Sequence, residues 1–154
     1  MAKIKSTSKS PRYDALRADS TRLGERNDCT VVSVAATTGV AYGVAHAQLA
    51  HYGRKPGRGA HLPVIANALK ALGFKIEKVP AEYFIRRYPK GKQDKSQVTT
   101  HQPERFPGAW EDGRNYILFT SGYRHAVGIV NGENVDWTKG RAMRVAEIWR
   151  IVRA

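Results

Sequence analysis

The sequence predicts an α+β domain in which helices come first and an antiparallel sheet follows. Between residues 30 and 73 the apolar segments are long and end at glycines, which is typical of helices. From residue 116 onward they are short and separated by turn residues, which is typical of strands. A helical first half followed by a run of strands favours the α+β class. The 154 residues fit one domain with a sizeable core.

The first expected helix covers residues 30–38. Its apolar residues are nearly continuous, Asn27 or Asp28 can cap its start, and Gly39 supplies its end. Several of these residues are β-branched, so a strand is the alternative interpretation. In either case the continuous apolar run indicates a buried segment.

Two further helices are expected before residue 73. One covers residues 41–52 and ends at Gly53. The other covers residues 62–72, with Pro63 in its first turn and Gly73 as its C-terminal stop. The sequence therefore predicts three helices in the first half of the chain.

After residue 73 the pattern changes to strands. A short helix is expected over residues 81–88, followed by a long irregular insert over residues 89–113, rich in Lys, Gln, Pro and Gly. Because inserts of this length are usually functional, we expect it to border the site. The expected strands are residues 74–79, 116–120, 125–130, 135–137 and 143–152.

The chain is strongly basic. Its formal net charge is +13, from 26 Lys and Arg against 13 Asp and Glu, and such a charge attracts polyanions. Residues 1–13 are polar, basic and aperiodic, so we expect a flexible arm there and a single domain over residues 14–154. Contacts with nucleic acid or a partner protein are expected at Lys3, Lys5, Lys9, Arg12, Arg54, Lys55 and Arg58.

The composition limits which cellular compartment and which cofactors we expect for this protein. The single cysteine excludes an intrachain disulfide and a Cys-x-x-Cys zinc site. No apolar signal core follows the basic N-terminus, and nowhere do about 18 apolar residues follow one another, so we expect a cytoplasmic protein without a membrane partner. His46 and His51 do not share a helix face, and residues 53–59 lack the end of a phosphate-binding loop. No metal or other cofactor is therefore expected.

Cys29 lies at a position where a thiol can be activated as a nucleophile. It directly follows the capping residues Asn27 and Asp28 and directly precedes the apolar run. The first turn of a helix presents free N–H groups and the positive end of the helix dipole, and both stabilise a thiolate. A lone cysteine is, however, most often a small buried hydrophobic residue. Position alone leaves that structural interpretation open.

His125 is the histidine best placed to act as the base for such a thiolate. It opens an expected strand that leads into Asn131-Gly132, a strong signal for a two-residue hairpin turn. With that turn Val127 lies opposite Asp136, which makes His125 and Asp136 diagonal neighbours on one face. Diagonal backbones are about 7 to 8 Å apart, close enough for a carboxylate to reach an imidazole. Asp136 is expected to orient His125 and to stabilise its charge.

The papain-like cysteine peptidases carry, in chain order, a cysteine on a helix, a histidine on a later strand and an aspartate on the next strand. This sequence has the same order and resembles that family. The closer likeness is to a group of small phage and bacterial proteins and covers roughly residues 24–152. It is carried by Arg26-Asn27-Asp28-Cys29-Thr30-Val31, Ala45-His46, Gly53-Arg54-Lys55, Arg58-Gly59, His125-Ala126-Val127 and Val135-Asp136-Trp137.

The resemblance implies a papain-like fold, with a central helix that begins at Cys29 and is packed on a C-terminal antiparallel sheet. In that frame Cys29 is the nucleophile, His125 the general base and acid, and Asp136 the orienting group. The likeness also implies a phage origin, with the host cytoplasm or the virion as the location.

The sequence departs from the papain-like family at the oxyanion hole. Those peptidases carry a glutamine shortly before the nucleophile, and this neighbourhood holds Arg22, Leu23 and Gly24 instead. Asn27 can supply a side-chain donor beside the Cys29 N–H, although its spacing suits a helix cap equally well.

Two functions from different classes follow. The first is a thiol hydrolase that cleaves a peptide, isopeptide or related amide bond of a peptide or protein substrate through an acyl-thioester on Cys29. The second is a catalytically inactive structural protein, such as a virion component, that binds other phage proteins or nucleic acid through its basic surface. The order of the three site residues favours the first, whereas the charge favours the second. A redox role is disfavoured, because no second cysteine can resolve an oxidised sulfur.

Overall fold

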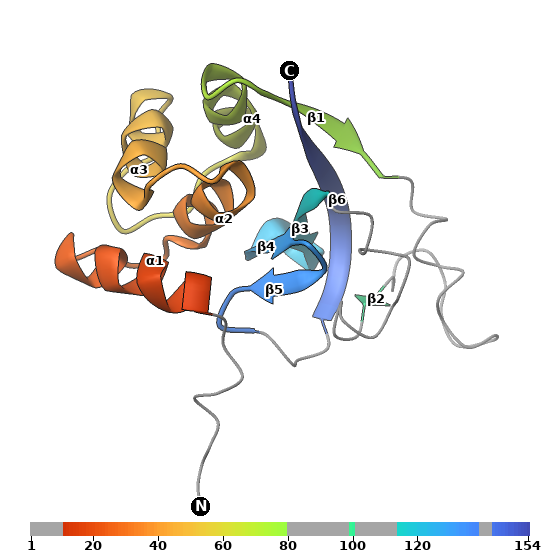
Figure 1. Ribbon diagram of the computed structural model, residues 1–154, viewed down its shortest axis with the longest axis horizontal. Helices are drawn as coiled ribbons and strands as arrows, with labels where there is room; N and C mark the ends of the chain where they lie inside the picture. The colour runs from red at the N-terminus through yellow and green to blue at the C-terminus, as the bar shows by residue number, and fades with distance from the viewer. Residues whose placement is uncertain (1–10, 80–98, 101–113, 139–142) are drawn as a thin grey trace, which may run out of the picture.

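The computed structural model of this chain describes residues 11–79, 99–100, 114–138 and 143–154. Within them the chain forms four α-helices that lie on one side of an antiparallel sheet (Figure 1). The α+β class predicted from the sequence is therefore confirmed. The helices are α1 (Pro11–Arg22), α2 (Cys29–Thr38), α3 (Tyr42–His51) and α4 (Leu62–Ala71). The strands are β1 (Phe74–Lys78), β2 (Thr99–Thr100), β3 (Asn115–Thr120), β4 (Ala126–Val130), β5 (Glu133–Val135) and β6 (Met143–Arg153).

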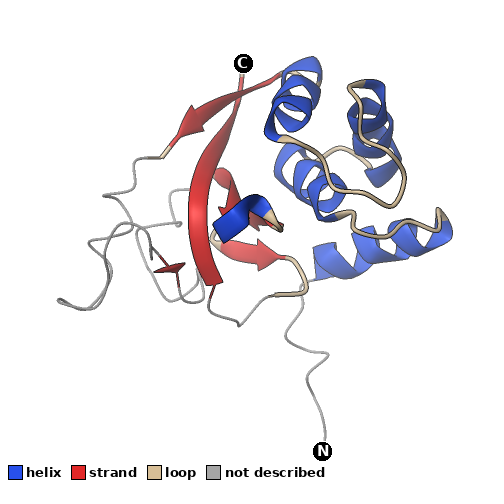
Figure 2. Cartoon of the chain, turned by 180° about the vertical axis from the view of Figure 1, so that it is seen from behind, coloured by secondary structure: helices blue, strands red, loops and turns tan. Residues whose placement is uncertain are grey.

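The strands follow the order β1-β6-β3-β4-β5, every neighbouring pair is antiparallel, and β2 pairs with β6. Figure 2 shows the sheet from behind, with the helices gathered on one side of it. Ile117 and Phe119 of β3 belong to the core that the sheet shares with the helices. Because side chains alternate along a strand, the buried Tyr116 and Leu118 lie on the opposite face.

Helix α2 is the centre of the fold. All residues of Thr30–Thr38 are buried, and α2 contacts the other three helices of the described chain as well as β3 and β4. The Thr37 hydroxyl donates to the Ser33 carbonyl at 2.7 Å, so this polar side chain is satisfied inside the core. The helix ends at Gly39, whose φ of 81° is one that glycine adopts without strain. The segment is a helix and not the alternative strand.

Strand β4 approaches α2 closely at Gly128. A Cβ atom at this position would lie 3.5 Å from Ser33 Cα and 3.5 Å from Ala36 Cβ. A methyl group would therefore be in contact, and a larger side chain would push the two elements apart. The close approach fixes the distance between the helix that begins at Cys29 and the strand that follows His125.

Helix α1 was not predicted from the sequence. It begins at Pro11, so residues 11–13 belong to a helix and not to the arm expected over residues 1–13, of which residues 1–10 lie outside the described chain. Its buried residues are only Tyr13, Leu16 and Ser20, and the rest of the helix is exposed or half-buried. Such a narrow apolar stripe gives little helical signal, and packing against α2 and α3 stabilises the helix instead.

The other predicted elements lie close to their expected ranges. The helices expected over residues 41–52 and 62–72 are α3 and α4, and the five expected strands are β1, β3, β4, β5 and β6. The helix expected over residues 81–88 lies outside the described residues, as does the insert over residues 89–113 apart from β2. In the described ranges no single helix is long and apolar enough to cross a membrane, although α2 and α3 together, bent by 119°, pass that test of length and composition.

Candidate active site

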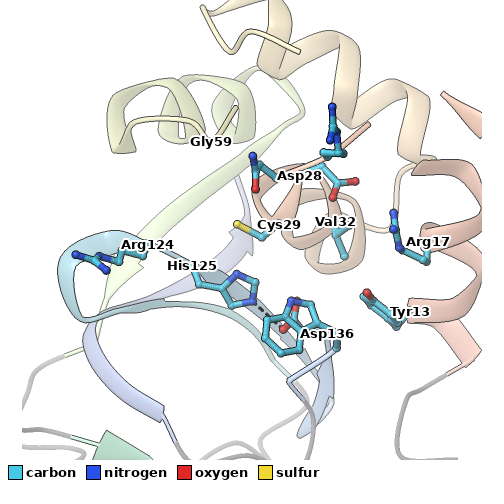
Figure 3. Close-up of a pocket in the computed structure, with 12 residues that line it drawn as sticks. Tyr13, Arg17, Asp28, Cys29, Val32, Gly59, Arg124, His125 and Asp136 are labelled. Atoms are coloured by element: carbon cyan, nitrogen blue, oxygen red, sulfur yellow. Dashed lines mark hydrogen bonds and ion pairs between the residues drawn. The ribbon is translucent and has the colours of Figure 1, made fainter. Parts of the chain in front are cut away.

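Cys29, His125 and Asp136 line a common cleft of about 630 Å³. The cleft lies where α1 and the start of α2 meet the β4–β5 hairpin, and Figure 3 shows the three side chains near one another there. Tyr13 and Arg17 of α1 form the wall on one side. The fold thus brings together three residues that are far apart in the chain.

Cys29 is the first residue of α2 and is partly exposed. The first backbone bond into the helix runs from the Val32 N–H to the Asp28 carbonyl, so the N–H groups of Cys29, Thr30 and Val31 have no acceptor within the helix. The Ala126 N–H donates to the Cys29 sulfur at 3.4 Å, which ties the start of α2 to the start of β4. A helix N-terminus and an N–H that points at the sulfur are surroundings in which cysteine side chains act as nucleophiles.

The β4–β5 hairpin has the register predicted from its turn. Val130 pairs with Glu133 and Gly128 with Val135, and the two turn residues Asn131 and Gly132 have φ angles of 53° and 80°. Positive φ at both positions defines the tight turn that matches the twist of the strands. This register makes residues 125 and 136 diagonal neighbours, as the sequence predicted.

Asp136 holds the imidazole of His125. His125 Nε2 lies 2.8 Å from Asp136 Oδ2. The backbone N–H and the hydroxyl of Thr138 donate to the same oxygen at 3.0 and 2.6 Å. The Asp136 carboxylate is only 2% exposed, so these contacts compensate for its burial. Because Nε2 is engaged, Nδ1 is the ring nitrogen that can exchange a proton with the sulfur.

Burial lowers the pKa of His125, but hydrogen bonding and charge from Asp136 and from Cys29 outweigh burial and raise this pKa to about 10. The imidazole is therefore positively charged at neutral pH. The ring of Trp137 lies beside it, with 5.5 Å between ring centroids. The charged imidazole lies beside the Cys29 sulfur, whose contact is one of the causes of the raised pKa of His125.

The two candidate capping residues have other partners than the helix. Asp28 is the residue before α2, but its carboxylate makes no cap and accepts a hydrogen bond from the Tyr42 hydroxyl at 2.6 Å. Burial, followed by this contact, raises the pKa of Tyr42. The Asn27 side chain donates to the Gly57 carbonyl at 3.0 Å and lines the cleft. The predicted side-chain cap is therefore wrong, because both side chains reach to distant segments.

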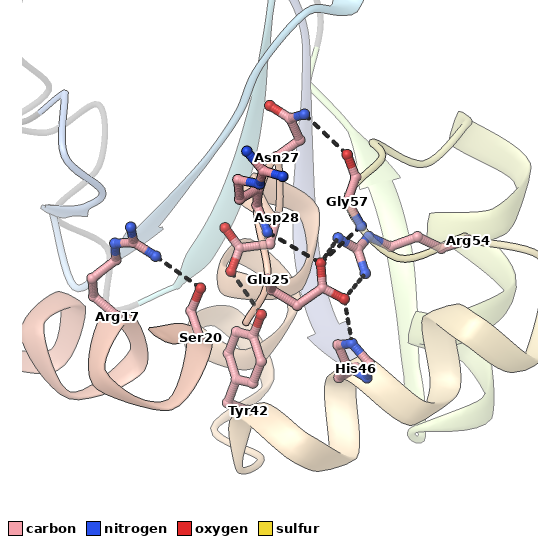
Figure 4. A network of polar contacts seen from close by, with 10 residues as sticks. Arg17, Ser20, Glu25, Asn27, Asp28, Tyr42, His46, Arg54 and Gly57 are labelled. Atoms are coloured by element: carbon pink, nitrogen blue, oxygen red, sulfur yellow. Dashed lines mark hydrogen bonds and ion pairs between the residues drawn. The ribbon is translucent and has the colours of Figure 1, made fainter. Parts of the chain in front are cut away.

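A second polar cluster, centred on Glu25, supports the loop before Cys29 (Figure 4). Glu25 is 6% exposed and accepts hydrogen bonds from both terminal nitrogens of Arg54, at 3.1 and 3.0 Å. The Gly57 N–H donates at 2.9 Å, and His46 Nε2 lies 2.6 Å away. The Arg54 guanidinium, ahead of the other contacts, lowers the pKa of Glu25 to about 2. Glu25 was not predicted as a site residue from the sequence, although Ala45-His46 and Gly53-Arg54-Lys55 are among the strings that carry the family resemblance.

The basic residues expected to bind a partner have different environments. Arg54 is 4% exposed and its guanidinium is paired with Glu25, so the prediction that it binds a partner is wrong. Arg12 belongs to α1, and its guanidinium donates to the carbonyls of Ala35 and Val40. Lys55 and Arg58 are exposed, and their role stays a prediction. Lys3, Lys5 and Lys9 lie outside the described residues.

No group of three or more His, Cys, Asp or Glu side chains that could hold a metal ion occurs within the described ranges. Comparison of the chain with models of known protein families, with curated proteins and with solved structures gives no match. The chemistry of the cleft is therefore the basis for assigning a function.

Proposed function

We propose that this protein is a papain-like thiol hydrolase that cleaves an amide bond through an acyl-thioester on Cys29. The supporting observation is that Cys29, at the free N-terminus of the central helix, faces His125, whose far ring nitrogen is bonded to the buried Asp136. An activated thiol, a base and an orienting group in this order are what nucleophilic catalysis by cysteine requires.

The reaction has two steps. The Cys29 thiolate attacks the carbonyl carbon of the amide, an S–C bond forms, and the charged His125 gives its proton to the leaving nitrogen as the C–N bond breaks. The neutral imidazole then takes a proton from water, whose oxygen attacks the thioester. The S–C bond breaks, the acid leaves, and the thiolate and the imidazolium are restored.

The start of α2 supplies donors for the oxygen that becomes negative in each step. The Cys29 N–H has no helical partner and lies at the positive end of the helix dipole. The Asn27 amide lines the cleft and keeps a second N–H beyond the one that it gives to Gly57. In this arrangement Asn27 takes the place of the glutamine found in papain-like peptidases, beside the Cys29 N–H. Each such donor contributes on the order of 100-fold to the rate.

Iodoacetamide labelling of Cys29 tests the hydrolase. At pH 6 the wild-type protein is expected to react at least about ten times faster than N-acetylcysteine, because a charged histidine beside a cysteine at a helix N-terminus promotes its reaction with alkylating agents. The advantage should disappear in His125→Ala. His51→Ala, an exposed histidine outside the cleft, is the matched control and should react like the wild type. Labelling no faster than the free thiol would contradict the hydrolase.

A binding protein on the same frame is the second candidate, and the net charge of +13 favours it. Among the described basic residues, Lys55 and Arg58 are exposed and lie near one another in the chain. If this function holds, affinity for DNA falls steeply as salt rises and falls further in the Lys55→Gln, Arg58→Gln double variant. Retention that does not depend on salt would exclude nucleic acid as the partner.

A further inference from the structure

Cys29 and His125 line two clefts of opposite character within the described chain. The cationic cleft, of about 630 Å³, includes Arg17 and Arg26, and Arg124 lines both clefts. The apolar cleft, of about 400 Å³, includes Leu62, Ile65 and Phe119. A substrate bound across the two side chains would enter both clefts, one on each side of the bond to be broken.

The cationic cleft carries charge that its own acids do not neutralise. Arg17 comes from α1 and Arg26 from the loop before α2. Arg124 comes from the segment before β4 and lies on the other side of His125 from Arg17 (Figure 3). Of the two carboxylates in this cleft, Asp136 is paired with His125 and Asp28 accepts from the neutral Tyr42 hydroxyl, so the guanidinium groups outnumber the remaining carboxylate charge.

The availability of these guanidinium groups indicates an anionic ligand. Arg26 and Arg124 make no ion pair with any described residue. Arg17 donates to the Ser20 hydroxyl at 2.9 Å, which steadies its guanidinium without neutralising it. Guanidinium groups in a cleft bind carboxylates in a planar, directional way.

The apolar cleft carries one polar atom that lacks a partner. Leu62 and Ile65 come from α4 and Phe119 comes from β3, so the walls are built from the helical layer and the sheet. Thr30 also lines this cleft, is 5% exposed, and its hydroxyl has no hydrogen-bond partner in the described residues. A buried hydroxyl without a partner is costly unless a ligand supplies one. A peptide backbone passing Cys29 carries both donors and acceptors for it.

We propose that the substrate is a peptide segment with an acidic side chain on the α1 side of the scissile bond and a bulky apolar side chain on the α4 side. This inference rests on the proposed hydrolase, since it names the substrate class of that same cleft. Arg17 and Arg26 recognise the acid, Leu62 and Phe119 enclose the apolar group, and the Thr30 hydroxyl bonds to the peptide backbone.

Two alkylating agents that differ in charge test the cationic cleft without a substrate. The measured quantity is the ratio of the rate constants of Cys29 with iodoacetate and with iodoacetamide, at low salt. Each of Arg17→Gln and Arg26→Gln is expected to lower this ratio about threefold, which is the effect of one unit charge about 7 Å from an anion in water. Lys70→Gln removes the same charge from an exposed site on α4 that lines neither cleft and should leave the ratio unchanged. An unchanged ratio in the Arg17→Gln, Arg26→Gln double variant would overturn the assignment of the cleft to an acid.

Digestion of a mixed peptide pool, with the cleaved bonds read by mass spectrometry, tests both sides. The expected result is Asp or Glu near the cut on one side and Leu, Phe or Met near it on the other. The Arg17→Glu, Arg26→Glu double variant should reverse the preference for acids, and Leu62→Ser should weaken the apolar preference. Cleavage without either preference would overturn the proposal.

The outcomes separate this inference from the hydrolase itself. Fast, His125-dependent labelling by iodoacetamide together with no charge preference, or with no cleavage of any peptide, leaves an activated thiol and rejects the peptide substrate class. Slow labelling, equal to that of a free thiol, rejects the hydrolase, and the substrate assignment fails with it.

Discussion

Among the described residues, two carboxylate–histidine pairs flank the start of α2, and they differ in what else the carboxylate binds. Glu25 lies 2.6 Å from His46, and Asp136 lies 2.8 Å from His125. Glu25 also receives both terminal nitrogens of Arg54, whereas Asp136 receives only Thr138 besides its histidine. The charge of Glu25 is neutralised by the Arg54 guanidinium, whereas the charge of Asp136 is compensated by His125.

Because of that difference, the pKa of the carboxyl group is shifted in one pair and the pKa of the histidine in the other. In the first pair, Arg54 lowers the pKa of Glu25 to about 2. Around Asp136 the base is affected: burial opposes the charged ring, but Asp136 and Cys29 together raise the pKa of His125 to about 10. The Glu25–His46 pair therefore holds the loop before α2, whereas the Asp136–His125 pair keeps a charged base beside the Cys29 sulfur. The additional neighbour of each pair, Arg54 in the first and Cys29 in the second, causes this difference.

The largest expected effect is on stability, at Glu25. Glu25→Ala leaves the buried Arg54 without a partner and should lower the free energy of unfolding by about 3 to 5 kcal/mol. Urea unfolding measures this change. Glu77→Ala, which removes an exposed carboxylate from a 3.4 Å contact with Arg150, is the matched control and should cost less than about 1 kcal/mol. Equal costs would show that the Glu25 pair is no stronger than a surface contact.

Acid should weaken the Glu25 cluster in a defined range of pH. The folded pKa of Glu25, about 2, lies below its ordinary value of 4.5, so its contribution is complete above pH 4.5 and is lost as the pH falls toward 2. The difference in unfolding free energy between wild type and Glu25→Gln should shrink by up to about 3 kcal/mol across that range. A difference that does not change with pH would contradict this pKa.

Reactivity should separate the two histidines. At pH 6, His125→Ala is expected to slow the iodoacetamide labelling of Cys29 about 100-fold, which corresponds to about 2.7 kcal/mol, because the charged ring that stabilises the thiolate is lost. His46→Ala should change the rate less than about twofold, since His46 lies against Glu25 and lines neither cleft. Similar losses in both variants would mean that the histidines act through folding alone.

The smallest expected effect is on the pKa of His125. Asp136→Asn removes one of its two anionic neighbours and should lower this pKa by at least about one unit, or about 1.4 kcal/mol. NMR of the ring carbons follows the titration. Because the folded pKa lies above the ordinary 6.5, the pair stabilises the fold fully below pH 6.5 and loses that contribution as the pH rises to 10. In Asp136→Asn this loss of stability should be complete at a lower pH than in the wild type. An unchanged pKa of His125 in the variant would contradict the role of Asp136 as the orienting group.

Local patterns in the sequence determined the order of the predicted elements and the hairpin register. The register could be predicted because Asn131-Gly132 permits a tight two-residue turn, and the turn places Asp136 beside His125 without reference to the rest of the chain. Helix α1 could not be predicted, because its few buried residues matter only once α2 and α3 lie against them.

Only the tertiary structure decided which charges are used inside the protein and which remain for a ligand. Arg54 and Arg58 are equivalent in the sequence, yet one is buried on Glu25 and the other is exposed. The same holds for Asp28, whose carboxylate reaches Tyr42 and not the helix that it precedes. Turn geometry and side-chain period act between near neighbours in the chain, whereas the choice of an ionic partner depends on segments that only folding brings together.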